Sequence, residues 1–187
     1  MFGFLKPKTS ILETPVRDVY EAVIARSREP VFYIDHGVAD TVDGRFDMIA
    51  LHVCLILRRL RRAGRSGEDF SQPLFDLMFM DMENNLREMG IGDMGIPKRM
   101  RKLIKAFYGR AGAYGDALDL EYPRGRENAL TEALSRNLYR ENIPKQETLE
   151  AMARYVDAVA ADLEDQAVEN LVAGKVRFAA LPDGKGE

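Results

Sequence analysis

Tryptophan is absent from this sequence of 187 residues, which also contains only one cysteine and two histidines. The single cysteine, Cys54, excludes a disulfide within the chain and is compatible with a reducing compartment. It lies in an apolar run, where we expect a small buried side chain. His52 and Cys54 are two residues apart, so they do not share a helix face, and with His36 they match no zinc-binding spacing. We therefore predict no metal site, a hydrogen-bonded core role for His52 and a loop position for His36.

Long hydrophobic runs are also missing. The longest, 48–57, has ten residues, whereas a membrane-spanning helix needs roughly 20. This run is therefore expected to form a core helix. The opening residues "MFGFLKPKTS" resemble neither a signal peptide nor an organelle transit peptide. We expect a cytoplasmic protein, and the sequence is compatible with peripheral membrane contact.

The sequence has no recognisable catalytic machinery. It contains neither a nucleophile elbow nor a Cys–His pair, and "YGRAG" lacks the Gly-Lys-Ser/Thr ending of a phosphate-binding loop. The acids Asp81, Glu83, Glu88 and Asp93 are expected to form a solvated helix face and a helix-start acid. We predict no enzymatic activity and no cofactor. An enzyme would instead be indicated by one deep pocket that holds Asp81, Glu88, Asp93 and Arg110 together.

Helical periodicity dominates what is present. The composition, 46% hydrophobic and 30% charged, is that of a globular protein. Apolar residues recur every three or four positions over most of the chain. We expect one all-α domain of about six to seven helices over 14–174, preceded by an N-terminal segment, 1–13, and followed by a flexible tail, 175–187.

Local signals suggest where helices begin and end. Thr14 is a predicted N-cap with Pro15 at the first helical position, and Asp43 is a predicted N-cap of the central helix. Pro73 is expected to mark an early turn or a new helix start. The stretch 30–40 is the one segment that looks extended, and we interpret it as a connector.

Charges are unevenly distributed. The segment 141–169 carries eight acids and two cations, whereas cations gather in two other places. The first cluster contains Arg58, Arg59, Arg61, Arg62 and Arg65; the second contains Lys98, Arg99, Arg101, Lys102, Lys105 and Arg110. These clusters either pair with the acidic helix inside the fold or present a basic face to a ribosome, RNA or anionic lipid.

Methionines concentrate in the same region as the second cationic cluster. Six of the nine are Met78, Met80, Met82, Met89, Met94 and Met100. Flexible methionine side chains suit binding of varied apolar partners, and core filling is the alternative. Between these methionines, Gly90, Gly92, Asp93 and Pro97 predict a tight turn that joins two helices.

Two long strings carry a family resemblance. "LRRLRRAG" and "LFDLMFMDMENNLREMGIGDMGIPKRMRKLIKAFYGRAGAYGDAL" resemble the ubiquinol–cytochrome c chaperone family. The likeness is strong from about 46 to 120 and weaker to about 174. It implies an all-helical, non-enzymatic assembly factor for the cytochrome b subunit of respiratory complex III.

The resemblance also implies partners. Mitochondrial members act in the matrix, associate with a small partner protein near the ribosomal exit tunnel, and hold newly made cytochrome b for haem insertion. Because this chain shows no transit peptide or long N-terminal extension, it resembles a bacterial member. We expect a chaperone whose client binds near Met78–Met100, between the cationic clusters. The alternative is a ribosome- or RNA-associated basic helical binding module.

Overall fold

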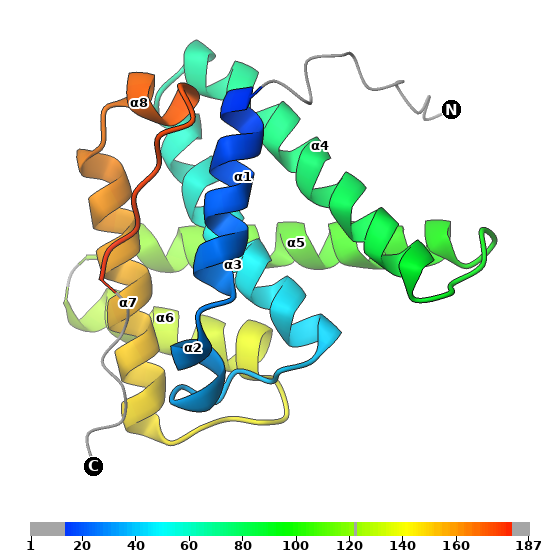
Figure 1. Cartoon of the computed structure of the whole chain (residues 1–187). Coiled ribbons are helices and arrows are strands. Elements are labelled where there is room, and N and C mark those ends of the chain that lie inside the picture. The colour runs from blue at the N-terminus through cyan, green and yellow to red at the C-terminus, as the bar shows by residue number, and fades with distance from the viewer. Residues whose placement is uncertain (1–13, 122, 181–187) are drawn as a thin grey trace.

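The computed structural model describes residues 14–121 and 123–180, and every regular element in them is helical (Figure 1). The predicted all-α fold is therefore confirmed. The longer helices each have 11 or more residues, and α2 and α8 are short pieces of five residues. The elements are α1 (Thr14–Ser27), α2 (Pro30–Ile34), α3 (Val42–Arg61), α4 (Arg65–Glu88), α5 (Ile96–Leu118), α6 (Arg124–Leu134), the π-helical segment η2 (Ser135–Tyr139), α7 (Gln146–Asp165) and α8 (Val168–Val172).

Helix α3 occupies the centre of the molecule. Met48, Leu51, Ile56 and Leu60 are at most 1% exposed, which confirms the prediction that this run is a core helix. Helices α1, α4, α5 and α7 all pack against it (Figure 1). A helix that is apolar on most of its circumference is stable in water only when other elements cover it in this way.

The N-terminal cap of α3 differs from the prediction. The helix begins at Val42, and the Thr41 hydroxyl accepts a hydrogen bond from the Gly44 amide at 3.1 Å. Thr41 is therefore the N-cap. The predicted cap, Asp43, lies in the first turn, where the helix dipole also favours a carboxylate. Helix α1 begins at Thr14, one position before the start predicted with Thr14 as the N-cap, and Pro15 lies in its first turn.

His52 is a core histidine, as predicted. Its Nδ1 lies 2.9 Å from the Met48 carbonyl and 3.1 Å from the Ser27 hydroxyl, and its Nε2 lies 2.8 Å from the Tyr155 hydroxyl. Burial lowers the pKa of His52 to about 4, so the ring is neutral at neutral pH. His36 lies in a loop, also as expected, although it is buried.

Two local predictions differ from the structure. Within the stretch 30–40, residues 30–34 form α2 rather than an extended segment, and residues 35–40 connect α2 to α3 without helix or strand. Pro30 suits the first turn of α2, because the N–H groups there have no helical acceptor. Pro73 starts no new helix, and α4 runs through it from Arg65 to Glu88. A proline inside a helix is costly. Burial of Phe70 and Leu74 on either side of it offsets that cost.

Residues 175–180, which the sequence assigns to a flexible tail, pack along the end of α7 without forming a helix (Figure 1). The Gln166 side chain accepts a hydrogen bond from the backbone amide of Arg177 at 2.8 Å. It also donates one to the backbone carbonyl of Arg177 at 3.0 Å. The Phe178 ring then reaches His52, with ring centroids 5.3 Å apart. The expected N-terminal segment, 1–13, and residues 181–187 lie outside the described residues.

Gly67 sets the crossing of α3 and α4, and its replacement tests this packing. A Cβ atom at Gly67 would lie 2.0 Å from the Leu60 carbonyl oxygen, whereas one at Gly109 on α5 would meet nothing within 4 Å. We expect Gly67→Ala to lower the free energy of unfolding by about 2 kcal/mol or more. Gly109→Ala should raise it by about 0.5–1 kcal/mol through helix propensity alone. Urea titration followed by circular dichroism measures both, and equal effects in the two variants would rule out the close crossing.

Candidate functional site

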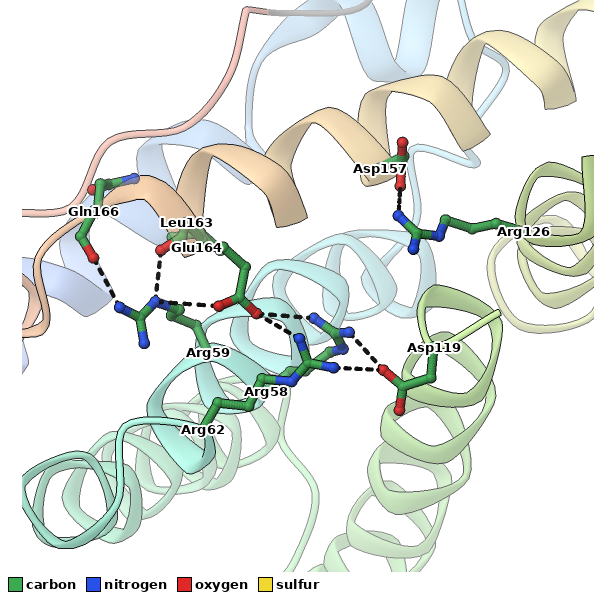
Figure 2. Close-up of polar contacts among 9 residues, drawn as sticks. All are labelled: Arg58, Arg59, Arg62, Asp119, Arg126, Asp157, Leu163, Glu164 and Gln166. Carbon is green, nitrogen blue, oxygen red and sulfur yellow. Dashed lines mark hydrogen bonds and ion pairs between the residues drawn. The ribbon is translucent and has the colours of Figure 1, made fainter. Parts of the chain in front are cut away.

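Two arginines of the first cluster, Arg58 and Arg62, share two acidic partners near the surface (Figure 2). Arg58 and Arg62 both donate to Asp119 Oδ1, at 2.6 and 2.7 Å. Both also reach Glu164 Oε1 on α7, at 3.3 and 3.0 Å. Arg58 lowers the pKa of Asp119 by hydrogen bonding to it. Internal pairing with acidic partners therefore accounts for Arg58 and Arg62, whereas Arg65 is exposed without an ion-pair partner among the described residues.

Arg59 has a different role at the same junction. Its Nε and Nη2 donate to the carbonyls of Leu163 and Gln166, at 2.9 and 3.0 Å (Figure 2). These carbonyls lie at the C-terminal end of α7, where backbone acceptors lack helical partners and a cation is favoured. Arg59 therefore fastens α3 to the end of α7. Arg61 is exposed and has no ion-pair partner among the described residues.

Arg110, predicted as part of the second basic surface, is instead buried. It is 5% exposed and donates to Asp47 Oδ1 at 2.6 Å, while Arg140 donates to the other oxygen at 2.5 Å. Burial raises the pKa of Asp47 to about 7, against the opposing pull of the two arginines. Asp47 lies on α3, 63 positions away from Arg110 in the sequence, so this ion pair joins α5 to α3 inside the fold.

The other five cations of α5 do form a surface. Lys98, Arg99, Arg101, Lys102 and Lys105 are all exposed. They have no ion-pair partners among the residues that the structure describes. The apolar side of the same helix, with Met100, Leu103, Ile104 and Phe107, packs against the core. This segment of α5 therefore presents an unpaired cationic face to solvent.

The six methionines do not form one surface. Met78 and Met82 are in the core, and Met100 is packed partly against it. Met80, 37% exposed, lies in a groove of about 500 Å³ between α1 and α4. The other two are exposed at the turn between α4 and α5, where Met89 is 53% and Met94 is 97% accessible.

The turn itself has the predicted chemistry. Gly90 adopts a φ of +79°, a left-handed conformation that favours glycine after a helix end. Gly92 follows in the loop, and Pro97 lies in the first turn of α5. The Asp93 carboxylate pairs with Arg87 of α4 across the turn.

The acids of this region do not converge on a catalytic pocket. Asp81 accepts a hydrogen bond from the Tyr20 hydroxyl on α1 at 2.8 Å, and Glu83 pairs with Arg87 at 2.8 Å. Glu88 is exposed near the turn, and Arg110 is in the interior. The arrangement that would have indicated an enzyme is therefore not formed. Within the described ranges, no group of three or more histidines, cysteines or acids is placed to hold a metal ion.

An open groove of about 710 Å³, which no sequence motif predicts, lies between α3, α4 and α5. Phe75, Phe107 and Tyr108 contribute its aromatic lining, with ring centroids 5.5 to 6.0 Å apart. Gly112 and Gly115 line it on the α5 side, where a Cβ would meet nothing within 4 Å. The arginines Arg58, Arg61 and Arg62 stand at its α3 end. The glycine spacing in "YGRAGAYG" was the one local signal for this groove, since its other residues come from separate helices.

None of the helices in residues 14–121 and 123–180 is both long and apolar enough to cross a membrane.

The arginine network at the groove can be tested through one of its acids. Glu164→Gln removes the charge that Arg58 and Arg62 share, so we expect the free energy of unfolding to fall by about 1 kcal/mol, and by less in high salt. Glu132→Gln is the matched control, because Glu132 is 72% exposed and lies 3.9 Å from Arg136. Thermal or urea unfolding at two salt concentrations provides the measurement. If both variants behave alike, the network does not hold α3 to α7.

The sequence of this chain is similar to those of known proteins. A family model described as "Ubiquinol-cytochrome C chaperone" matches residues 35–178. The ubiquinol-cytochrome-c reductase complex assembly factor 1 of Xenopus laevis is 25% identical over 138 residues, which are 74% of this chain and 66% of the frog protein. The mouse protein of that name is 24% identical over 164 residues, covering 87% of this chain and 54% of its own. The chain thus spans less than two thirds of the length of these curated relatives.

A solved structure supports the same assignment. The crystal structure of the Cbp3 homolog from Brucella abortus matches with a TM-score of 0.80 and 37% sequence identity, covering 92% of each chain. The family is one of chaperones and assembly factors, not of enzymes. The family model covers well over half of the sequence, and the resemblance seen in the two arginine- and methionine-rich strings is confirmed. The chain belongs to the ubiquinol–cytochrome c chaperone family.

Proposed function

We propose that this protein is an assembly chaperone that binds newly made cytochrome b during biogenesis of the respiratory cytochrome bc complex. Two findings support the assignment to this complex: membership of the family, and the names of the curated relatives, which are assembly factors of that complex. The observation that carries the client-binding role is the open aromatic groove between α3, α4 and α5. The role needs binding and release, and no covalent chemistry.

The α5 side of the groove offers apolar area suited to an unassembled membrane subunit. Tyr108 is 61% exposed, so its ring offers apolar area to a partner in addition to the area already used in packing. Gly112 and Gly115 leave the α5 backbone uncovered on the same side. Small residues at a contact allow another helix to approach closely. An apolar helix of the client, not yet inserted in the bilayer, therefore fits this lining.

The charged end of the groove favours a client with polar flanks. Arg61 is exposed there without an ion-pair partner among the described residues, beside Arg58 and Arg62. An acidic or carbonyl-rich loop next to an apolar client helix would find a donor in Arg61, whereas Glu68, Asp116 and Asp119, which also line the groove, would suit a basic loop. We place this step at the cytoplasmic face of the inner membrane, and a small partner protein remains a further prediction from the family resemblance.

The ribosome or RNA alternative loses support at the first arginine cluster and at Arg110. It keeps support at the exposed cations of α5. Arg58, Arg59 and Arg62 have acidic or carbonyl partners within the chain, and Arg110 is buried, so these four offer little to phosphate. The exposed cations Lys98 to Lys105 are the observation that still favours an anionic partner.

Site-specific photocrosslinking in cells tests the client and its position together. A photoreactive amino acid at Tyr108 should capture cytochrome b, because that side chain is exposed in the groove. The same probe at Glu132, exposed on α6 and outside the groove, is the matched control and should capture none. Tyr108→Ala should weaken client capture by about 2 kcal/mol in affinity, as for a central interface aromatic.

A probe at Met80 separates the two grooves. Met80 lies between α1 and α4, on a different side of α4 from Phe75. Capture of cytochrome b from Met80 and not from Tyr108 would keep the chaperone role and move its site. Capture from neither position, with the protein folded and expressed, would refute client binding by either groove.

A further inference from the structure

The turn between α4 and α5, residues 89–95, lies at the far end of these two helices from α7 (Figure 1). It exposes two large apolar side chains, with Met94 97% and Met89 53% accessible. The turn glycines Gly90 and Gly92 add no side chain to cover them. Apolar side chains that project this far from the core gain no burial in the folded chain.

Directly after this turn comes the unpaired cationic face of α5. At about 100° per residue, Lys98, Arg101, Lys102 and Lys105 cluster on the side of the helix opposite Phe107, and Arg99 lies at the edge of that face. No acid occurs between Met94 and Gly115, so none within this helix segment competes for the cations. We call the two methionines and these five cations the basic tip.

Exposed apolar side chains beside a stripe of cations match the chemistry of an anionic lipid surface. At such a surface, apolar groups enter the boundary between headgroups and acyl chains while lysines and arginines contact the phosphates. RNA recognition would instead use aromatic rings for base stacking. The basic tip has none, because residues 80–106 contain no aromatic side chain.

We propose that the basic tip docks on a bilayer that contains anionic lipids, with Met94 and Met89 inserted between headgroups. Three acids lie nearby: Glu83 and Asp93 share Arg87, and Glu88 faces solvent without an ion-pair partner among the described residues. The five cations of the basic tip outnumber these acids. Docking does not depend on the identity of the client. Failure of the lipid contact and failure of the client assignment are therefore separate results.

The geometry links the tip to the groove. Tyr108 follows Lys105 by three positions, so the two side chains are neighbours on α5. With the tip on the membrane, the aromatic lining would begin beside the cations that contact the headgroups. If the proposed function holds, a client would be received next to the bilayer into which it is inserted.

Vesicle cosedimentation of the 187-residue chain tests the contact. Binding is expected to vesicles of equal parts phosphatidylcholine and phosphatidylglycerol, to weaken with added salt, and to be absent from phosphatidylcholine alone. Arg99→Gln with Lys102→Gln should weaken binding about tenfold or more. Arg65→Gln with Lys145→Gln removes one exposed arginine and one exposed lysine elsewhere and should change it less than about twofold.

The apolar half of the tip needs its own comparison. Met94→Gln should weaken vesicle binding about threefold or more, whereas Ile143→Gln, at a residue that is 57% exposed elsewhere, should not. Because Cys54 is buried, Met94→Cys provides one exposed thiol for an environment-sensitive dye. Its emission should shift to the blue with anionic vesicles and stay unchanged with neutral ones.

Three results would overturn the lipid proposal. The first is no binding to anionic vesicles by the folded chain. The second is an equal loss in the tip variant and its charge-matched control, which indicates nonspecific attraction. The third is cosedimentation with ribosomes that depends on Arg99 and Lys102 while vesicle binding does not, which assigns the cations to RNA.

Discussion

The burial of α3 on almost every side is the constraint on which the rest of the structure depends. Its core residues, from Met48 to Leu60, need apolar neighbours around the whole helix, so α1, α4, α5 and α7 must all pack against it. Its charged end emerges where Arg58 and Arg62 meet Asp119 of the α5 terminus and Glu164 of α7. Helices α4 and α5 meet at their turn and separate toward α3 (Figure 1), and the groove lies where they separate.

Features decided by local sequence were predictable, and features decided by distant partners were not. The α3 core, the role of His52, and the turn with Gly90 and Pro97 follow from periodicity and backbone chemistry. Arg110 and Lys105 both look like surface cations in the sequence. Arg110 is buried because the fold brings Asp47 to it, whereas Lys105 has no such partner among the described residues and is exposed. The groove has no linear motif, because three helices build it.

Helix α5 connects the two proposed surfaces. Its first turns carry the cations of the basic tip, and its later turns carry Tyr108 and the groove glycines. A chaperone for a membrane subunit needs a surface for the client and a means of staying near the bilayer, and in our proposals both surfaces are carried by this one helix. The methionines that suggested a single adaptable surface are instead divided between the core, the α1–α4 groove and the tip.

The most direct test of the chaperone assignment is deletion of the gene, followed by measurement of assembled complex III and of cytochrome b. We expect both to fall, the intact chain to restore them, and a chain with Tyr108→Ala to restore them poorly although it folds. Tyr108 is 61% exposed, so its truncation should leave the core intact. Normal levels of complex III and cytochrome b in the deletion strain would contradict the account.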